Sequence, residues 1–125
     1  MNVKWLRLFN HPKGYKYRAL NAWTYFSPRY KRAITIPRGF ECDGASGPAW
    51  DIGSDAWGVH DVLCRLGTWD DKTPLCNWQA SSVLGDILRA DGHWARASYW
   101  KYATLFFGCD AAKANGMFKV KQGRD

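Results

Sequence analysis

Acidic residues are absent from the first 38 positions of this chain, although those positions hold nine of its eighteen lysines and arginines. The net charge of +7 therefore arises in the N-terminal third. A basic face beside a near-neutral remainder suits phosphate-bearing partners such as nucleic acid, anionic lipid headgroups or lipopolysaccharide, and it equally suits a solubilising surface. The positions that we expect to bind an anionic surface are Lys13, Lys16, Arg18, Arg29, Lys31 and Arg32.

Long apolar runs are also missing from the sequence. The longest, Tyr102 to Cys109, is well short of the roughly 20 residues that span a bilayer. Between Met1 and Lys16, charged side chains interrupt short apolar pairs, and no secretory signal segment is evident. We therefore expect a protein that is made in a cytosol and meets any membrane only from its surface.

The four cysteines form no C-x-x-C pair, and their spacings of 22, 12 and 33 residues match no standard zinc ribbon or finger. A zinc site of Cys42, His60 and Cys64 has no second metal-ligand spacing to support it. Four cysteines could form two disulfides. Without a secretory signal, however, we expect reduced and mostly buried thiols.

The length of 125 residues, with 46% apolar and 16% aromatic residues, predicts one folded domain with one core. The expected class is α+β, with an N-terminal antiparallel β hairpin or small sheet followed by three to four helices. Residues 1–43 are expected to be mainly β, 44–54 a loop, 55–115 mainly α and 116–125 a tail.

Local patterns indicate where these elements lie. The aromatic segment Tyr15 to Phe26 and the β-branched segment Ala33 to Ile36 flank a turn at Ser27 to Tyr30, which predicts a hairpin. Apolar spacing of three and four residues, together with capping residues, predicts the helices. They are expected from Ser54 or Asp55 to Leu66, with a stop at Gly67, then over Asn77 to Ala90, Trp94 to Phe107 and Asp110 to Asn115.

The adjacent pair His60 and Asp61 is the strongest candidate for chemistry, although helical geometry separates the two side chains by about 100° around the axis. His60 could act as a general base only if another helix supplied an orienting carboxylate, for which Asp86 and Asp110 are the candidates. Alternatively, His60 is a partly buried structural residue and Asp110 is a helix N-cap.

Asp61 also has two interpretations. With main-chain carbonyls from the loop between Asp43 and Pro48, where Gly44 and Gly47 allow carbonyls to turn inward, it would form an oxygen-rich calcium site. Otherwise it anchors the backbone amides of that loop. Asp43 and Gly44 then form an ordinary turn.

The run from Ile36 to Pro48, I-P-R-G-F-E-C-D-G-A-S-G-P, and the run from His60 to Gly67, H-D-V-L-C-R-L-G, resemble the domain-of-unknown-function 1353 family of phage and prophage proteins. The likeness covers about Tyr17 to Gly108 and implies a phage or prophage origin without an established activity. The chain departs from the family pattern at Cys42 (usually Thr), Cys64 (usually Tyr) and Ser81 (usually Asp).

A shorter stretch, His60 to Cys64, is similar to the H-D-x-C core of secreted phospholipases A2, with one extra residue before the cysteine. That similarity implies His60 as base, Asp61 with the backbone around Gly44 and Gly47 as a calcium site, and Asp110 as the orienting carboxylate. Most of the paired half-cystines of those enzymes are missing here.

Two functions follow as hypotheses. The first is a phage-type accessory hydrolase that cleaves an ester of the host envelope, with basic strands and tryptophans at the anionic surface. The second is a non-enzymatic virion or tail-associated subunit, in which the Asp43 loop and the His60 helix lock the fold. Nucleic acid is a less favoured partner, because no recognised reading motif occurs.

Overall fold

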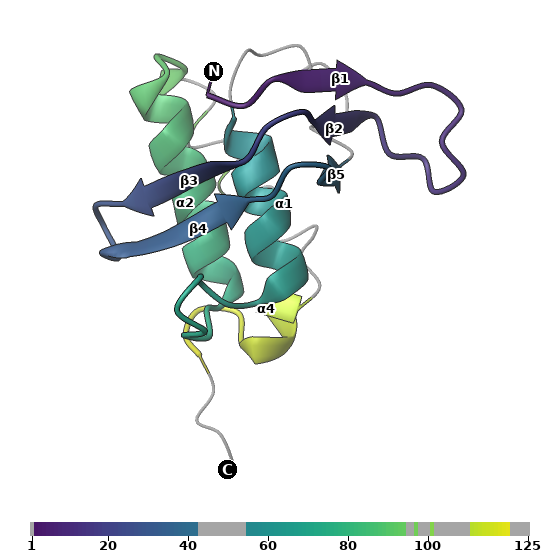
Figure 1. The fold of residues 1–125 in the computed structure, drawn as a ribbon. Helices are drawn as coiled ribbons and strands as arrows, with labels where there is room; N and C mark the ends of the chain where they lie inside the picture. Colours follow the sequence, from purple (N-terminus) through teal and green to yellow (C-terminus); the bar gives the residue numbers. More distant parts are fainter. Residues whose placement is uncertain (1, 43–54, 95–96, 98–100, 102–110, 121–125) are drawn as a thin grey trace.

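The computed structural model describes residues 2–42, 55–94, 97, 101 and 111–120. In the described part, five strands precede the helices (Figure 1). The elements are β1 (Trp5–Arg7), β2 (Tyr17–Ala19), β3 (Trp23–Ser27), β4 (Arg32–Ile36), β5 (Glu41–Cys42), α1 (Ala56–Leu66), α2 (Asn77–Ala90) and α4 (Ala111–Asn115).

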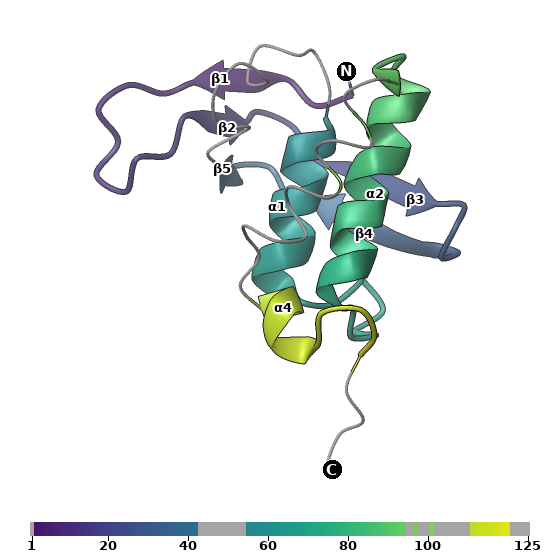
Figure 2. The same ribbon diagram turned by 180° about the vertical axis from the view of Figure 1, so that it is seen from behind.

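The strands form two small antiparallel sheets, one ordered β1-β2-β5 and the other the hairpin β3-β4. Both sheets lie on the same side of α1 and α2, which run side by side in opposite directions (Figures 1 and 2). The connection between β1 and β2 extends beyond the helices as a protruding ribbon.

The β-to-α order confirms the expected α+β class, but the expected arrangement was wrong in detail. In place of one hairpin or small sheet and three to four helices, the described residues form two sheets and two helices of more than two turns. The segment α4 has only five residues, too few to be stable without tertiary contacts. The helix expected over Trp94 to Phe107 lies largely outside the described residues.

The hairpin turn and both main helices were predicted correctly, because their signals are local. The expected first arm of the hairpin, Tyr15 to Phe26, was wrong, because β2 in one sheet and β3 in the other divide it. In β4, the period of two turns Ile34 and Ile36 into the core, where neither has measurable exposure. In α2 the expected apolar positions Val83, Leu84, Ile87 and Leu88 are all buried. The two helices and β4 therefore enclose one apolar core.

Gly67 ends α1 as expected, with a left-handed φ of 68°, and its N–H donates to the carbonyl of Leu63. The next contact is tertiary: Asn115 of α4 donates to the carbonyls of Gly67 (2.8 Å) and Leu75 (3.0 Å). The short α4 is thereby fixed against the end of α1.

Asp55 precedes α1 but does not cap it with its side chain, contrary to expectation. Its buried carboxylate instead accepts hydrogen bonds from the N–H groups of Asn2 (2.6 Å) and Val3 (3.3 Å) and from Nε1 of Trp5 (3.2 Å). A buried carboxylate needs such donors. The start of α1 therefore holds β1 in place.

Trp5 then packs on α1 at Gly58, where no side chain would fit. A Cβ on Gly58 would lie 2.5 Å from Cζ2 and 2.6 Å from Cη2 of Trp5, and 3.2 Å from Cδ1 of Ile36. We expect Gly58→Ala to lower the free energy of unfolding by about 1–3 kcal/mol, because overpacking exceeds the gain in helix propensity.

Urea denaturation of the two alanine variants Gly58→Ala and Gly85→Ala tests this expectation. Gly85 lies in α2, and a Cβ there meets its neighbours at 3.5 Å, an ordinary contact distance. Its replacement should therefore be neutral or stabilise the protein by up to about 1 kcal/mol. Equal effects of the two substitutions would show that the close contact with Trp5 is not the cause.

Candidate functional site

The candidate site is built around α1, which carries His60, Asp61, Cys64 and Arg65 within two turns. His60 faces the interior with 8% of its surface exposed, whereas Asp61 reaches Arg65 at the surface. The two adjacent side chains thus point in different directions, as helical geometry predicts. They do not form a catalytic dyad with each other.

His60 lies one turn before Cys64, and the Cys64 sulfur is 3.4 Å from Nε2 and 3.7 Å from Nδ1 of the imidazole. Burial lowers the pKa of His60 from 6.5 to about 4, because the apolar surroundings disfavour the charged ring. The imidazole is therefore neutral at physiological pH. In the described part of the chain, its ring has no hydrogen bond to a carboxylate.

The expectation of reduced thiols was wrong for Cys64, which is disulfide-bonded. Cys42 and Cys76 are buried and form no disulfide, as predicted. A disulfide sulfur has no proton to donate and cannot supply the thiolate that zinc binds. The zinc site of Cys42, His60 and Cys64 is therefore not supported. Nor do the described residues contain any group of three or more His, Cys, Asp or Glu that could hold a metal.

Asp61 accepts a hydrogen bond from Nη2 of Arg65 at 3.0 Å in an i,i+4 ion pair. A guanidinium at this distance opposes a divalent cation on the same carboxylate. Arg65 thus engages one oxygen of the Asp61 carboxylate, and the calcium-ligand role of Asp61 stays a prediction. The other expected calcium ligands, Asp43, Gly44 and Gly47, lie outside the described residues. The role of Asp61 in anchoring their loop stays a prediction.

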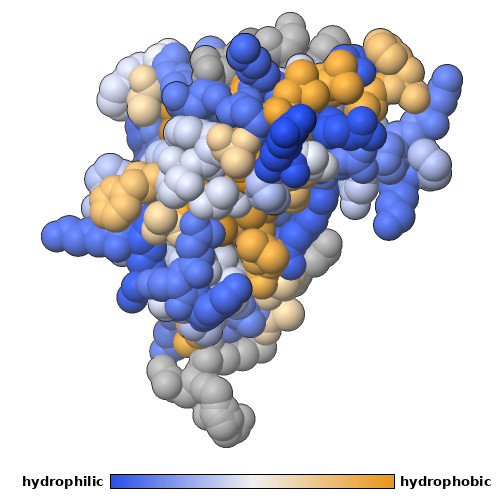
Figure 3. Space-filling model, viewed as in Figure 1, coloured by the Kyte–Doolittle hydropathy of each residue, from blue (hydrophilic) through white to orange (hydrophobic). Residues whose placement is uncertain are grey.

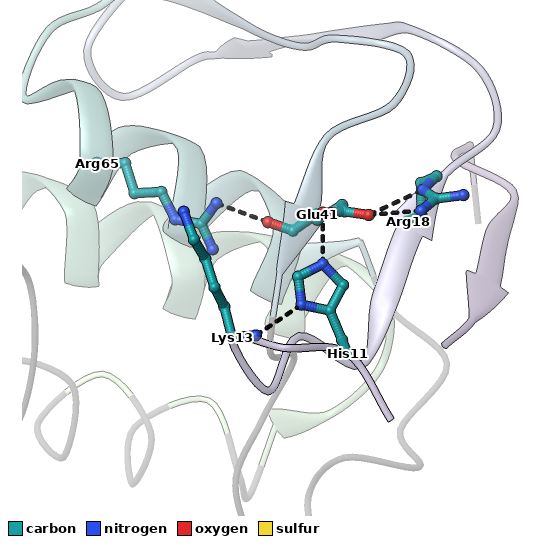
Figure 4. A network of polar contacts seen from close by, with 5 residues as sticks. All are labelled: His11, Lys13, Arg18, Glu41 and Arg65. Atoms are coloured by element: carbon teal, nitrogen blue, oxygen red, sulfur yellow. Dashed lines mark hydrogen bonds and ion pairs between the residues drawn. The ribbon is translucent and has the colours of Figure 1, made fainter. Parts of the chain in front are cut away.

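Arg65 is the residue that the sequence reasoning missed, although it belongs to the His60 motif. Its Nη1 donates to the carbonyl of Glu41 at 2.6 Å (Figure 4). The guanidinium carbon also lies 4.6 Å from the ring centre of Tyr15 and 4.7 Å from that of Phe40. Arg65 thus joins α1 to β5 and to the connection between β1 and β2.

Glu41 is bound on both carboxylate oxygens in the network that Figure 4 shows. Arg18 donates from Nε (2.9 Å) and Nη2 (2.7 Å) to Oε2, and the Nε2 of His11 lies 2.9 Å from Oε1. Because Nδ1 of His11 accepts the N–H of Lys13, Nε2 carries the proton and donates to Glu41. Hydrogen bonds from Arg18 and then from His11 lower the pKa of Glu41.

No local signal could have revealed this network. Arg18 and Glu41 face each other only because β2 pairs with β5 across 23 residues of sequence. Strand β5 has two residues, too few to show an alternating pattern. The network connects the protruding ribbon to the motif on α1.

Asp86, one of the two carboxylates proposed to orient His60, has other partners. Its oxygens accept from Nε and Nη2 of Arg29, each at 2.8 Å, and from Nη2 of Arg89 at 2.6 Å. Burial raises the pKa of Asp86, but the hydrogen bonds of the two arginines outweigh it and lower the pKa overall. Asp110, the other candidate, lies outside the described residues.

The six cations proposed for surface binding divide into two groups. Arg18, Arg29 and Arg32 form ion pairs within the protein, to Glu41, Asp86 and Asp71 respectively. Lys13, Lys16 and Lys31 are exposed, and none of them lies in an ion pair with a described carboxylate. The lysines, rather than the arginines, are therefore available to an external anion.

None of the helices in the described ranges is long and apolar enough to cross a membrane.

The candidate site combines a buried neutral histidine, an arginine held by four groups and a set of exposed lysines. Comparison of the chain with protein-family models, with curated proteins and with solved structures finds no match.

Proposed function

We propose that this chain is a non-enzymatic accessory subunit of a phage, associated with the virion or its tail. The phage assignment rests on the loop and helix motifs that resemble the domain-of-unknown-function 1353 family. The non-enzymatic assignment rests on one observation: His60 is buried, and that burial lowers its pKa to about 4. The proposed place of synthesis is the cytoplasm of the bacterial host.

The surroundings of His60 support this proposal most directly. A general base must reach the proton that it removes, and it works best with a pKa near the working pH. His60 is buried, with a pKa lowered to about 4 by that burial. In the described part of the chain no carboxylate holds its ring in a productive tautomer. Such a histidine is better suited to packing than to proton transfer.

Arg65 gives the motif a structural task instead. It ties α1 to β5 through the Glu41 carbonyl, and its guanidinium lies over the rings of Tyr15 and Phe40. Asp61 holds the guanidinium in this orientation. The helix motif thus fixes the position of the protruding ribbon, which a subunit that docks through that ribbon would need.

Purified particles of the phage that encodes the chain test the proposal. We expect the protein at a fixed copy number per particle, and we expect a His60→Phe variant to be incorporated as well as the parent. Arg65→Ala should reduce incorporation, because it releases the ribbon. Absence of the protein from particles that are free of host debris would refute the proposal.

A second candidate function, hydrolysis of an envelope ester, is favoured by one observation. The disulfide-bonded Cys64 follows His60 by one turn, as a half-cystine follows the histidine in the phospholipase motif that the sequence resembles. Release of fatty acid from phospholipid vesicles, measured with and without calcium, tests this function. Activity that His60→Gln abolishes while the fold stays intact would favour the hydrolase over the structural subunit.

A further inference from the structure

The outward face of the β1-β2-β5 sheet combines exposed leucines with lysines. Strand pairing sets Leu6 opposite Arg18, and a backbone hydrogen bond of 2.8 Å from Leu20 to the Lys4 carbonyl continues the register. Successive residues of a strand point to opposite faces. We define the outer sheet face as Lys4, Leu6, Lys16, Arg18 and Leu20.

The opposite face of the same strands packs on the core. Ala19 has 1% of its surface exposed, and Trp5 contacts α1 at Gly58. On the outer face, in contrast, Leu6 is 42% and Leu20 is 47% exposed. The space-filling view shows strongly hydrophobic side chains gathered over β1 and β2 among hydrophilic ones (Figure 3). No described segment covers them.

Apart from Glu41, which stands opposite Arg18 in the strand register and pairs with it, the charges of this face are positive. Lys4 and Lys16 form no ion pair with any described carboxylate, and Glu41, the single acid among residues 2–42, is bound by Arg18 and His11. In the connection between β1 and β2, exposed Lys13 and Phe9, which is 77% exposed, extend the same mixture of cation and apolar surface. The outer sheet face therefore offers apolar contact and uncompensated positive charge together.

We propose that the outer sheet face binds the surface of an anionic lipid bilayer. The leucines enter the headgroup region, where burial of apolar surface is favourable, and Lys4 and Lys16 contact lipid phosphates. A second copy of the chain is a poorer occupant, because a two-fold interface would place the cations of one face against those of the other. The proposal concerns a different surface from the His60 motif and holds whether or not His60 is catalytic.

Co-sedimentation with vesicles tests the proposal. We expect the full chain to bind vesicles of equal parts phosphatidylglycerol and phosphatidylcholine, and to bind pure phosphatidylcholine at least tenfold more weakly. Rising salt should weaken the binding, because it screens exposed charges. Equal affinity for the two kinds of vesicle, or no binding to either, would overturn the proposal.

Matched variants locate the binding face. The pair Lys4→Gln and Lys16→Gln should weaken binding roughly fivefold for each lysine removed, and Lys119→Gln, another exposed lysine, should have little effect. The pair Leu6→Gln and Leu20→Gln should weaken binding roughly tenfold or more. Phe26→Gln removes an exposed apolar side chain from β3, outside the outer sheet face, and is the control for the leucine variants.

The folded state of each variant is checked by circular dichroism before binding is measured. If the outer-face variants bind as tightly as the parent, the outer face is not the site. Sedimentation velocity gives an independent outcome: a dimer that Leu6→Gln and Leu20→Gln dissociate would make a second copy the occupant and would also overturn the proposal. The lipid-binding results do not depend on the outcome of the virion assay, so the two proposals can fail separately.

Discussion

Between pH 6.5 and pH 4 the free energy of unfolding should fall by about 3 kcal/mol because of His60 alone. Burial holds the pKa of the folded histidine at about 4, whereas its ordinary value is 6.5. Between these values the unfolded chain binds a proton at His60 that the folded protein does not bind. The stabilising contribution is therefore complete above pH 6.5 and is lost as the pH falls.

Urea denaturation of the parent and of His60→Phe over this pH range measures the effect. The variant should lose most of the pH dependence between pH 6.5 and about pH 4.5, since an apolar ring of similar size has no proton to gain. The carboxylates Glu41 and Asp86, whose pKa values are lowered, lose their contribution only below their ordinary values of 4.5 and 3.8. They therefore do not contribute to the upper part of the range.

His60→Gln provides a second variant in case phenylalanine prevents folding, and it should remove the same pH dependence. A parent-like slope in both variants would contradict the assignment of the slope to His60. It would also remove the main physical argument that His60 is a packing residue. The same variants serve in the particle and lipid assays, so stability and function are compared in one set of proteins.

Replacement of Arg65 by alanine should lower the free energy of unfolding by about 3 kcal/mol. The substitution removes hydrogen bonds to the Glu41 carbonyl and to Asp61, and it removes contacts with the rings of Tyr15 and Phe40. Arg65→Lys keeps the charge but cannot bond to both partners in the same planar geometry. Its effect should be intermediate.

Arg32→Ala is the matched control for Arg65. Arg32 forms one ion pair with Asp71, in which the side chains are 41% and 52% exposed, and such pairs contribute little. We expect a loss below about 0.5 kcal/mol for this control. Amide hydrogen exchange should show faster exchange in the protruding ribbon of Arg65→Ala. Equal stability of the two alanine variants would refute the role of Arg65.

The sequence predicted those parts of the fold that depend on neighbouring residues. The helices α1 and α2 follow from apolar residues that recur every three or four positions, and Gly67 ends α1 because glycine adopts a left-handed φ without strain. The hairpin β3-β4 follows from two apolar segments around a turn. Each of these signals lies within one helix or one hairpin.

The three-stranded sheet was not predicted, because β1 and β5 have only three and two residues. Their pairing with β2 depends on contacts distant in sequence, including the hydrogen bonds to Asp55 from Trp5 of β1 and from Asn2 and Val3 before it. The contacts of Arg65 and Glu41 were not predicted for the same reason, because they also join residues that are distant in sequence. Asp86, on α2, was expected to orient His60. The Asp86 carboxylate instead accepts hydrogen bonds from Arg29, which lies in the turn between β3 and β4.

The sequence by itself determined that His60 and Asp61 share a helix and diverge around it, because the α-helix has a fixed angle per residue. It also determined that the N-terminal third is positively charged. Tertiary structure decided that His60 is buried and neutral, that Arg65 bridges three segments, and that leucines and lysines share one exposed sheet face. Burial, ion pairing and strand register arise between residues far apart in the chain, and local sequence patterns do not encode them directly.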